Sequence, residues 1–384
     1  MIIKYLFSDP GGDIQTGSTD IERPFLITPK KSHPFLTLGD YFHSIESFIF
    51  RDNGRYLLPI LIERFNKDIT LESINEVLIR TEKHGAFYHI ASVEILSNGT
   101  SVKLCVSTAL TKKGKQSLAH DLETISFLDQ AFEFSYLPKV YFKGDIECHS
   151  VAGAETFSML LAEWLEDYHE WHLSMDEKSK NQKIRIWDQK KGLRYASVDD
   201  SFEIFRQISK ILTLYYNTGD FSQIYPWHNA AGDFIVKNRD GNIDVKLTTV
   251  RRYEPFKTSV VTEDDISPML AIVYFFLNMS LQIRLDKFDG VGDVAWADDF
   301  SVQAALEGFF EALNIMESES RFYSGKVNEI LALLKIFDKK EIQKLIGSMT
   351  GLYQMEDPAD LSVIEVHLKD HVNRLYETIQ SFHL

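Results

Sequence analysis

The chain has 384 residues, of which 44% are hydrophobic and 25% are charged, a composition typical of globular proteins that excludes a mostly disordered chain. Its 41 basic and 56 acidic residues give a net charge of −15, so we expect no nucleic acid and no membrane among its partners. The two cysteines, Cys105 and Cys148, form no close pair, which favours a reducing, cytoplasmic location over a disulfide framework.

The first 80 residues predict an N-terminal arm and a helical extension. Residues 1–35 are rich in Gly, Pro, Asp, Ser and Thr, which favours loops and turns. From Thr37 to Arg80 apolar residues recur at helical spacing, and Thr70 opens the last of these helices. The apolar run before Asp9 is too short for a signal peptide, and Met269–Leu277 is too short to cross a bilayer.

Residues 81–162 predict a β-rich domain. Phe87–Leu96 and Ser101–Ala109 form a hairpin around Ser97-Asn98-Gly99, because a turn sequence separates two strand-like runs. Gln116–Gln130 carries apolar residues on one helical face. The strands Leu137–Phe142 and Thr156–Leu161 complete the expected sheet.

Residues 163–384 predict a mainly helical domain interrupted by one polar loop and hairpin at 225–250. Phe234–Val236 and Ile243–Leu247 flank the turn Asn238-Arg239-Asp240-Gly241, and Asp-Gly between two apolar runs is a strong hairpin signal. The expected helices are Phe202–Tyr216, Ile266–Leu285, Val302–Leu313, Val327–Ile336, Lys340–Leu352 and Leu361–Phe382.

The order of these elements carries a family resemblance. The segments are SLAHDLETISFLDQ (117–130), YLPKVYF (136–142), MLLAEWLEDYH (159–169), EDDISPMLAIVYFFL (263–277) and SVQAALEGFFEAL (301–313). In order and spacing they resemble the protein-kinase-like superfamily, in particular its aminoglycoside and choline phosphotransferase branch, over roughly residues 86–313. The resemblance implies an α+β, two-lobed protein-kinase-like fold, with a small antiparallel β-sheet lobe and a larger helical lobe behind the N-terminal helical extension.

The resemblance also implies ATP and Mg²⁺ as cofactors and a set of nucleotide-binding residues. The strand Lys of the family falls near Lys103, at least one residue from the centre of its run, with Lys112, Lys113 and Lys115 as nearby substitutes. The helix acid that pairs with this Lys corresponds to Asp121 or Glu123. Glu163 and Trp164 lie in the hinge-like segment, and Arg251, with Arg252, is placed to clamp a phosphate.

Two registers of the polar loop compete. In the first, which the hairpin fixes, His228 takes the catalytic Asp position and Asp233 a metal-binding position, and no carboxylate follows near Leu247–Thr249. In the second, Gly232-Asp233-Phe234 starts the motif, Asn238 follows five residues on, and Asp244 is the next metal carboxylate, too early in the sequence. We prefer the hairpin register, because backbone geometry is harder to shift than side-chain identity.

His228 is a candidate general base, since its ordinary pKa suits removal of a hydroxyl proton, but it also fits a packed histidine bonded to backbone. Asp233 fits either a Mg²⁺ ligand or a turn cap.

Other clusters predict solvated surfaces. His367 with His371, and His169 with His172 beside Glu170, have spacings that can bind a metal but read better as exposed helix faces or a cleft rim. The tryptophans Trp164, Trp171 and Trp227 fall where a kinase-like cleft is expected and could stack on a flat ligand.

Two functions follow from this pattern. The first is a pseudokinase-like protein that binds a nucleotide or another small molecule and has lost phosphoryl transfer. The second is an atypical small-molecule phosphotransferase that uses ATP and Mg²⁺. A ligand-free scaffold is a third interpretation, and the pattern predicts no oligomeric state.

Overall fold

The structure is a computed structural model that describes residues 1–9, 12–28, 31–85, 88–150, 152–188, 192–239, 241–255, 267–322, 325–351, 353 and 358–384. Asp240 of the predicted turn and Glu263–Ile266 of the last but one resemblance segment lie outside these residues. The chain divides into two compact units: unit 1 is Met1–Glu166 with Gln189–Lys191, and unit 2 is Asp167–Asp188 with Gly192–Leu384. Within the described ranges, no helix is long and apolar enough to cross a membrane.

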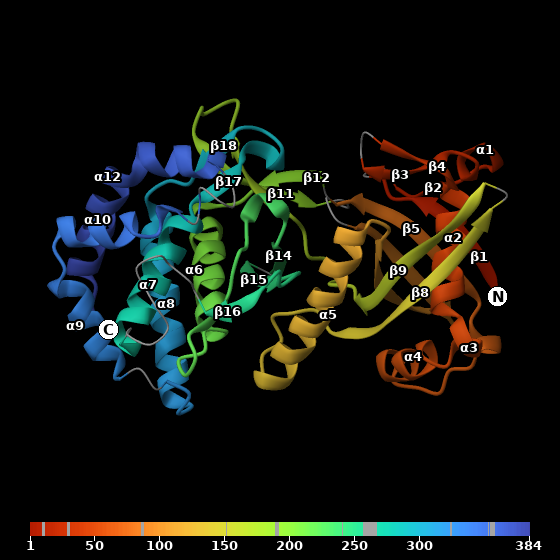
Figure 1. Ribbon diagram of the computed structural model, residues 1–384, viewed down its shortest axis with the longest axis horizontal. Helices are drawn as coiled ribbons and strands as arrows, with labels where there is room; N and C mark the ends of the chain where they lie inside the picture. The colour runs from red at the N-terminus through yellow and green to blue at the C-terminus, as the bar shows by residue number, and fades with distance from the viewer. Residues whose placement is uncertain are drawn as a thin grey trace. The chain divides into compact units, whose positions relative to one another are not determined.

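Unit 1 is built on a seven-stranded sheet in the order β2-β1-β5-β6-β7-β9-β8 (Figure 1). Its strands are β1 (Ile2–Phe7), β2 (Ile14–Gln15), β5 (Glu76–His84), β6 (His89–Ser97), β7 (Thr100–Ala109), β8 (Val140–Ser150) and β9 (Gly153–Glu163). All neighbours are antiparallel except β1 and β5. The predicted hairpin around Asn98-Gly99 is confirmed, as are the strands that became β8 and β9.

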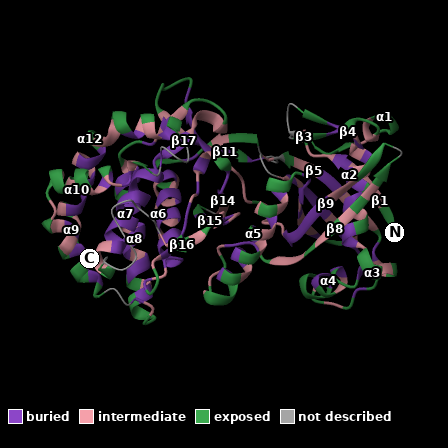
Figure 2. Cartoon of the chain, viewed as in Figure 1, coloured by how far each residue is buried: buried purple, intermediate pink, exposed green. Residues whose placement is uncertain are grey.

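Helices cover both faces of this sheet. On one face, α2 (Leu38–Ile49) and α4 (Leu57–Phe65), joined through the short α3 (Arg51–Gly54), enclose a core that contains Val77, Val93 and Leu104. On the other, α5 (Lys112–Ala131) packs against Ala109 and Leu160. Neighbouring strand residues point to opposite faces, so Lys103 lies on the same face of the sheet as Ala109. Figure 2 shows the buried interior of the central strands.

The prediction of a loop-rich arm at the N-terminus is wrong, because these residues form short strands. β1 pairs in parallel with β5, from Ile2 opposite Glu76 to Phe7 opposite Thr81. Behind β2 come α1 (Ser18–Ile21), β3 (Pro24–Thr28) and β4 (Lys31–Thr37). The turn residues are real, but they separate short strands, so residues 1–80 belong to the same compact unit as the strands that follow.

The helix expected from Thr70 to Arg80 is also wrong. Only η1 (Leu71–Ser73) is helical there, and β5 follows. The apolar pattern around Val77 fits both periods, and pairing with β1 and β6 on either side decides in favour of the strand.

Unit 2 is mainly helical, as predicted. It contains α6 (Val198–Leu214), α7 (Pro268–Gln282), α8 (Phe300–Ser318), α9 (Val327–Ile336), α10 (Lys339–Gly347) and α12 (Pro358–Ser381). α7 is buried nearly all round and α8 on its inner face (Figure 2). Gly308 lets α8 approach α6 closely, because a Cβ there would lie 2.0 Å from the backbone oxygen of Arg206.

A three-stranded sheet in unit 2 was not predicted. β10 (Trp171–Met175), β11 (Gln182–Asp188) and β12 (Gly192–Tyr195) pair in order, in a part of the chain that was predicted to be mainly helical. A second small hairpin joins β17 (Leu285–Lys287) through η3 (Phe288–Gly290) to β18 (Val294–Trp296).

The predicted loop and hairpin are confirmed. β13 (Ser222–Ile224) pairs with β16 (Tyr253–Pro255), and between them lie η2 (Asn229–Ala231), β14 (Phe234–Arg239) and β15 (Asn242–Leu247). α6 fixes the hairpin, because the Gln207 side-chain amide donates to the Ile243 carbonyl at 2.6 Å and accepts from the Val245 N–H at 3.0 Å. The helix before the loop therefore holds the strand after it.

Candidate functional site

Lys103 projects from the second sheet face in unit 1. Its neighbours Val102 and Leu104 point into the core, so Lys103 points away from it. The side-chain nitrogen lies 4.0 Å from the centre of the Trp164 ring, within the range of a cation–π contact. The structure therefore brings together two of the predicted cofactor-binding residues.

The acid beside Lys103 is Glu82 from β5, which the sequence analysis did not identify. A Glu82 carboxylate oxygen lies 3.1 Å from the Lys103 nitrogen and accepts a 2.5 Å hydrogen bond from the Ser92 hydroxyl. The Glu82 side chain is only 6% exposed, and its Oε2 has no hydrogen-bond partner among the described residues. The register shifts between Thr81 and Lys83, and this irregularity sets where Glu82 points. Burial beside these charges raises the pKa of Cys105 to about 12, so its thiol stays protonated.

The predicted helix acids lie elsewhere. Glu123 is exposed on α5. Asp121 is buried rather than exposed, and it accepts a 2.7 Å hydrogen bond from the Tyr88 hydroxyl. Glu163, at the end of β9, forms a 2.8 Å ion pair with Arg64. A strand acid thus occupies the place beside the strand Lys that the resemblance assigned to a helix acid.

His228 in unit 2 has both ring nitrogens engaged. Nδ1 accepts from the Ala230 N–H at 3.0 Å, and Nε2 lies 3.1 Å from a carboxylate oxygen of Asp360, at the start of α12. A neutral ring with its proton on Nε2 satisfies both contacts. In this arrangement His228 has no lone pair available to take a proton from a substrate hydroxyl.

Asp233 is 2% exposed and both its carboxylate oxygens are paired with Arg251. Oδ1 accepts from Arg251 Nη2 at 2.6 Å, and Oδ2 accepts from Arg251 Nη1 and, at 2.8 Å, from the His228 N–H. Burial raises the pKa of Asp233 above its ordinary value, and Arg251 and the His228 N–H act in the opposite direction. Because every partner is a donor, the carboxylate is ionised.

The groups predicted to hold Mg²⁺ do not fit one. Asp244 accepts a 2.6 Å hydrogen bond from the Tyr168 hydroxyl instead of facing Asp233. Thr248, where a second acid would follow the hairpin, donates its N–H to the Asp233 carbonyl at 2.8 Å. In the portion of the chain that the structure describes, no group of three or more His, Cys, Asp or Glu side chains could hold a metal ion.

Gly232 shapes this loop. Its φ of 70° lies in the left-handed region, and a Cβ there would come within 2.9 Å of a Glu170 carboxylate oxygen. In the second register, Asn238 was predicted to be a metal ligand, but its side-chain oxygen accepts a hydrogen bond from the Gly241 N–H inside the turn at 3.0 Å.

Arg252, the second candidate for a phosphate clamp, is half exposed, and its guanidinium lies 3.5 Å from Glu254.

The prediction that the paired histidines are solvated is wrong for His172 and His371. His172 lies on β10 and is buried, with Nδ1 3.2 Å from Asp286. Burial opposes its protonation, but hydrogen bonds to Asp286 and Glu170 outweigh burial and raise the pKa of His172 to about 9. His371 is fully buried against Arg284, and burial lowers its pKa.

Two of the tryptophans expected in a cleft belong to the core instead. Trp171 and Trp227 are both buried. Only Trp164 is half-exposed and close to a candidate binding residue.

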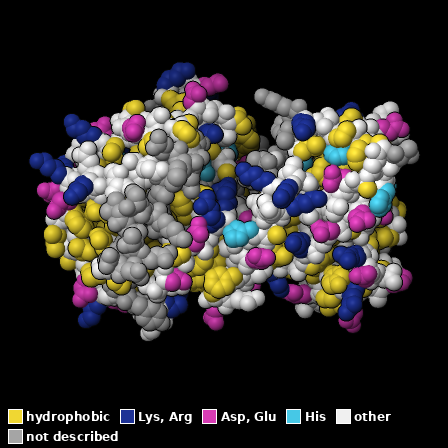
Figure 3. All heavy atoms as spheres, viewed as in Figure 1, with side chains coloured by type: hydrophobic (Ala, Val, Ile, Leu, Met, Phe, Trp, Pro, Cys, Tyr) yellow, Lys and Arg dark blue, Asp and Glu magenta, His cyan; other side chains and the backbone are white. Residues whose placement is uncertain are grey.

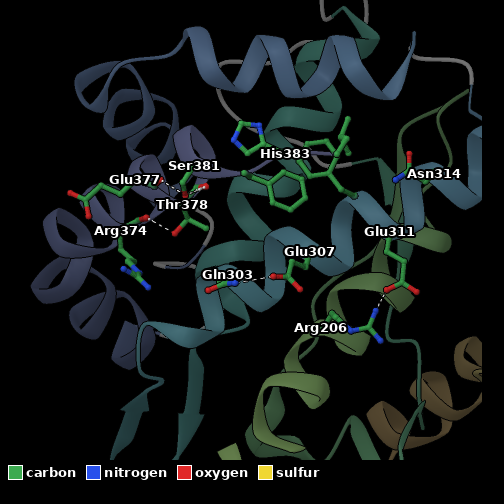
Figure 4. A pocket seen from close by; sticks show the side chains of 13 residues that line it. Arg206, Gln303, Glu307, Glu311, Asn314, Arg374, Glu377, Thr378, Ser381 and His383 are labelled. Atoms are coloured by element: carbon green, nitrogen blue, oxygen red, sulfur yellow. Dashed lines mark hydrogen bonds and ion pairs between the residues drawn. The ribbon is translucent and has the colours of Figure 1, made fainter. Parts of the chain in front are cut away.

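A cavity of about 980 Å³ lies along α6, α8 and the end of α12 in unit 2 (Figure 4). Arg206, Glu307 and Arg374 are among its lining side chains, and Arg206 is paired with Glu311. Acidic and basic side chains also mix over the face shown in Figure 3. The cavity contains none of the predicted site residues.

Comparisons with known proteins give no family assignment. No family model and no curated protein matches the chain. Among solved structures, Rad53 residues 1–466 in complex with AMP-PNP are similar at 13% identity and a TM-score of 0.33, over 73% of this chain and 66% of that one. A Plasmodium kinase domain is similar at 10% identity and a TM-score of 0.28, over 82% of this chain and 87% of that one. Both neighbours are protein kinases, and at such scores the likeness identifies neither an activity nor a ligand for this chain.

Proposed function

We propose that this chain is a kinase-like protein that binds a nucleotide or another small-molecule ligand in the cytoplasm, with phosphoryl transfer impaired or lost. Support for the kinase-like assignment comes from Lys103. In protein kinases the Lys that holds the nucleotide phosphates lies on the third strand, ahead of the helix that carries its acid. Lys103 lies on β7, the third strand of the series β5-β6-β7, and α5 follows directly.

The loss of transfer is supported by the loop before the β14–β15 hairpin. Phosphoryl transfer requires a group that positions the acceptor hydroxyl and carboxylates that hold the metal. His228 and Asp233 both use their polar atoms for contacts inside the protein, and this is the observation that carries the proposal. A loop closed in this way can persist as a structural element after the chemistry has gone.

Ligand binding is supported by the surroundings of the partly exposed Lys103. The ammonium group pairs with one oxygen of Glu82 and lies over Trp164, and its side chain is 22% exposed. A cation beside an aromatic ring suits a ligand that combines an anionic group with a flat ring, as a nucleotide does.

The alternative is an atypical phosphotransferase, and one observation favours it. A carboxylate that holds an imidazole nitrogen is the arrangement that orients a general base, and Asp360 holds His228 in this way. Nδ1 would become the base if its hydrogen bond from the Ala230 N–H opened. Asp360 would then be a positioning residue.

The test is ATP binding measured by calorimetry, together with a search for transfer of the γ-phosphate to water or to candidate acceptors. We expect binding that Lys103→Met weakens and that Lys143→Met, at an exposed position on β8, leaves unchanged. Binding without transfer supports the proposal, whereas transfer that is lost in Asp360→Asn supports the alternative. Absence of ATP binding at millimolar concentration contradicts a nucleotide-binding role for both.

A further inference from the structure

We propose that Arg251 is a built-in cation that takes the place of a divalent metal at Asp233, so that the loop excludes Mg²⁺. The inference rests on the proposed function only in taking this loop as the counterpart of a kinase catalytic loop. The exclusion of metal is a property of the loop alone and can be measured without a nucleotide.

The Asp233 carboxylate already accepts three hydrogen bonds. Arg251 donates to each carboxylate oxygen, and the His228 N–H donates to one of them. A guanidinium and a carboxylate match each other in this two-pronged geometry, which is stronger and more directional than a single contact. Three of the about four acceptor positions of the carboxylate are taken and the side chain is 2% exposed, so a metal ion could reach it only by displacing the guanidinium.

The charge of Arg251 also disfavours a Mg²⁺ ion at Asp233. Mg²⁺ needs near-ideal octahedral coordination and gives up its waters reluctantly, and in proteins it is held by one or two carboxylates. At Asp233 it would meet a single carboxylate that is already neutralised, beside a guanidinium that is always ionised. Displacing Arg251 would place two cations around one buried anion, which the low dielectric of the site makes unfavourable.

Contacts to the backbone hold the Asp233–Arg251 pair in place. Thr248 donates both its N–H, at 2.8 Å, and its hydroxyl, at 3.2 Å, to the Asp233 carbonyl. Arg251 Nη1 also lies 3.4 Å from the Pro226 carbonyl oxygen. The two ends of the segment are thus tied to each other on either side of the hairpin, so the ion pair is fixed before any ligand arrives.

Arg251 remains available to a ligand in one respect. Its side chain is 30% exposed, whereas Asp233 is 2% exposed. The guanidinium therefore covers the carboxylate and presents its outer edge to solvent. A ligand at this loop meets a fixed N–H edge in place of an exchangeable metal with its waters.

The experiment compares Mn²⁺ binding by the wild-type protein and by Arg251→Gln, followed by electron paramagnetic resonance and by the melting temperature in Mn²⁺ or Mg²⁺ against EDTA. We expect no saturable site at Asp233 in the wild type. Arg251→Gln frees the carboxylate and should gain a saturable Mn²⁺ site and a melting temperature that rises with the metal. Arg252→Gln, at the neighbouring exposed arginine, is the matched control and should gain neither.

Further variants keep the test decisive if Arg251→Gln does not fold. The double variant Asp233→Asn with Arg251→Gln replaces the ion pair by two amides and removes the carboxylate. A saturable Mn²⁺ site in the wild type that disappears in the double variant overturns the proposal, as does a folded Arg251→Gln that binds no Mn²⁺. Failure of ATP binding would contradict the proposed function but would leave the Mn²⁺ result intact, so the two failures are distinguishable.

Discussion

Glu82 and Asp233 are two buried carboxylates that each meet a cation, and they are held in different ways. In unit 1, Glu82 faces Lys103 through one oxygen, and its second oxygen has no partner among the described residues. In unit 2, Asp233 receives three donors on two oxygens, two of them from one guanidinium. The first pair keeps hydrogen-bonding capacity that a ligand could use. The second pair is closed, and we infer that it stabilises the loop.

The difference follows from the cations. Lys carries a point charge on a flexible stem, whereas Arg carries a rigid fork that matches a carboxylate. A Lys can therefore turn from Glu82 towards an anionic ligand while it remains over Trp164. An Arg in a two-pronged pair loses both bonds when it turns.

The largest effect should come from breaking the closed pair. Asp233→Ala leaves Arg251 without its anion and the His228 N–H without its acceptor, so we expect a loss of about 3–5 kcal/mol in the free energy of unfolding. Glu82→Ala should cost clearly less, because Lys103 is already partly solvated. Urea unfolding of both variants measures the comparison. Equal losses would contradict the distinction between an open and a closed pair.

A third buried pair, His172 with Asp286, extends the comparison to pH. The pKa of His172 is raised from 6.5 to about 9, so its contribution is fully present below pH 6.5 and is lost as the pH rises through about 9. We expect a loss of up to about 3 kcal/mol over this range, read from urea midpoints. His172→Asn should remove this slope, and a wild-type protein whose stability does not fall towards pH 9 would refute it.

The opposite sign is expected at His371. Its folded pKa lies below 6.5, so stability falls as the pH drops below that value, where the unfolded chain takes up the proton more readily. Replacement by Gln should flatten the acid side of the profile and leave the alkaline side unchanged.

The smallest effect, and the sharpest contrast, should come from exchanging the two cations. Lys103→Arg keeps a monodentate contact with Glu82 and should change stability by less than about 0.5 kcal/mol. Arg251→Lys loses the fork and one of the two bonds to Asp233 and should cost about 1–3 kcal/mol. Thermal unfolding of the two variants side by side tests this. A larger loss of stability in Lys103→Arg than in Arg251→Lys would mean that the Lys103–Glu82 pair is the more rigid of the two.

Sequence reasoning reached the hairpin and the loop because their signals are local. The turn at Asn238 and Gly241 and the apolar runs beside it define the strands without reference to the rest of the chain. Asp233 and Arg251 were both identified, one as a metal ligand and the other as a phosphate clamp. Their mutual pairing depends on how the chain closes between them, which no spacing rule specifies.

Glu82 and Asp360 show what sequence reasoning missed. The run Thr81-Glu82-Lys83 looks like a solvated charge cluster, and only the irregular register of β5 against β6 reveals that Glu82 is buried. Asp360 lies 132 residues from the histidine it contacts, and no motif links the two. A signal for such pairs would come from substitutions that vary together across related chains.

The parallel pairing of β1 with β5 bears on how the protein behaves when it is shortened. β1 covers the side of β5 from Glu76 to Thr81 with backbone hydrogen bonds along its whole length. A chain that lacked the first residues would present β5 as a free edge whose inner residues, Val77 and Ile79, are strongly apolar. Exposed edges of this kind recruit strands from other molecules. We therefore expect that a chain without β1 self-associates more readily than the full chain.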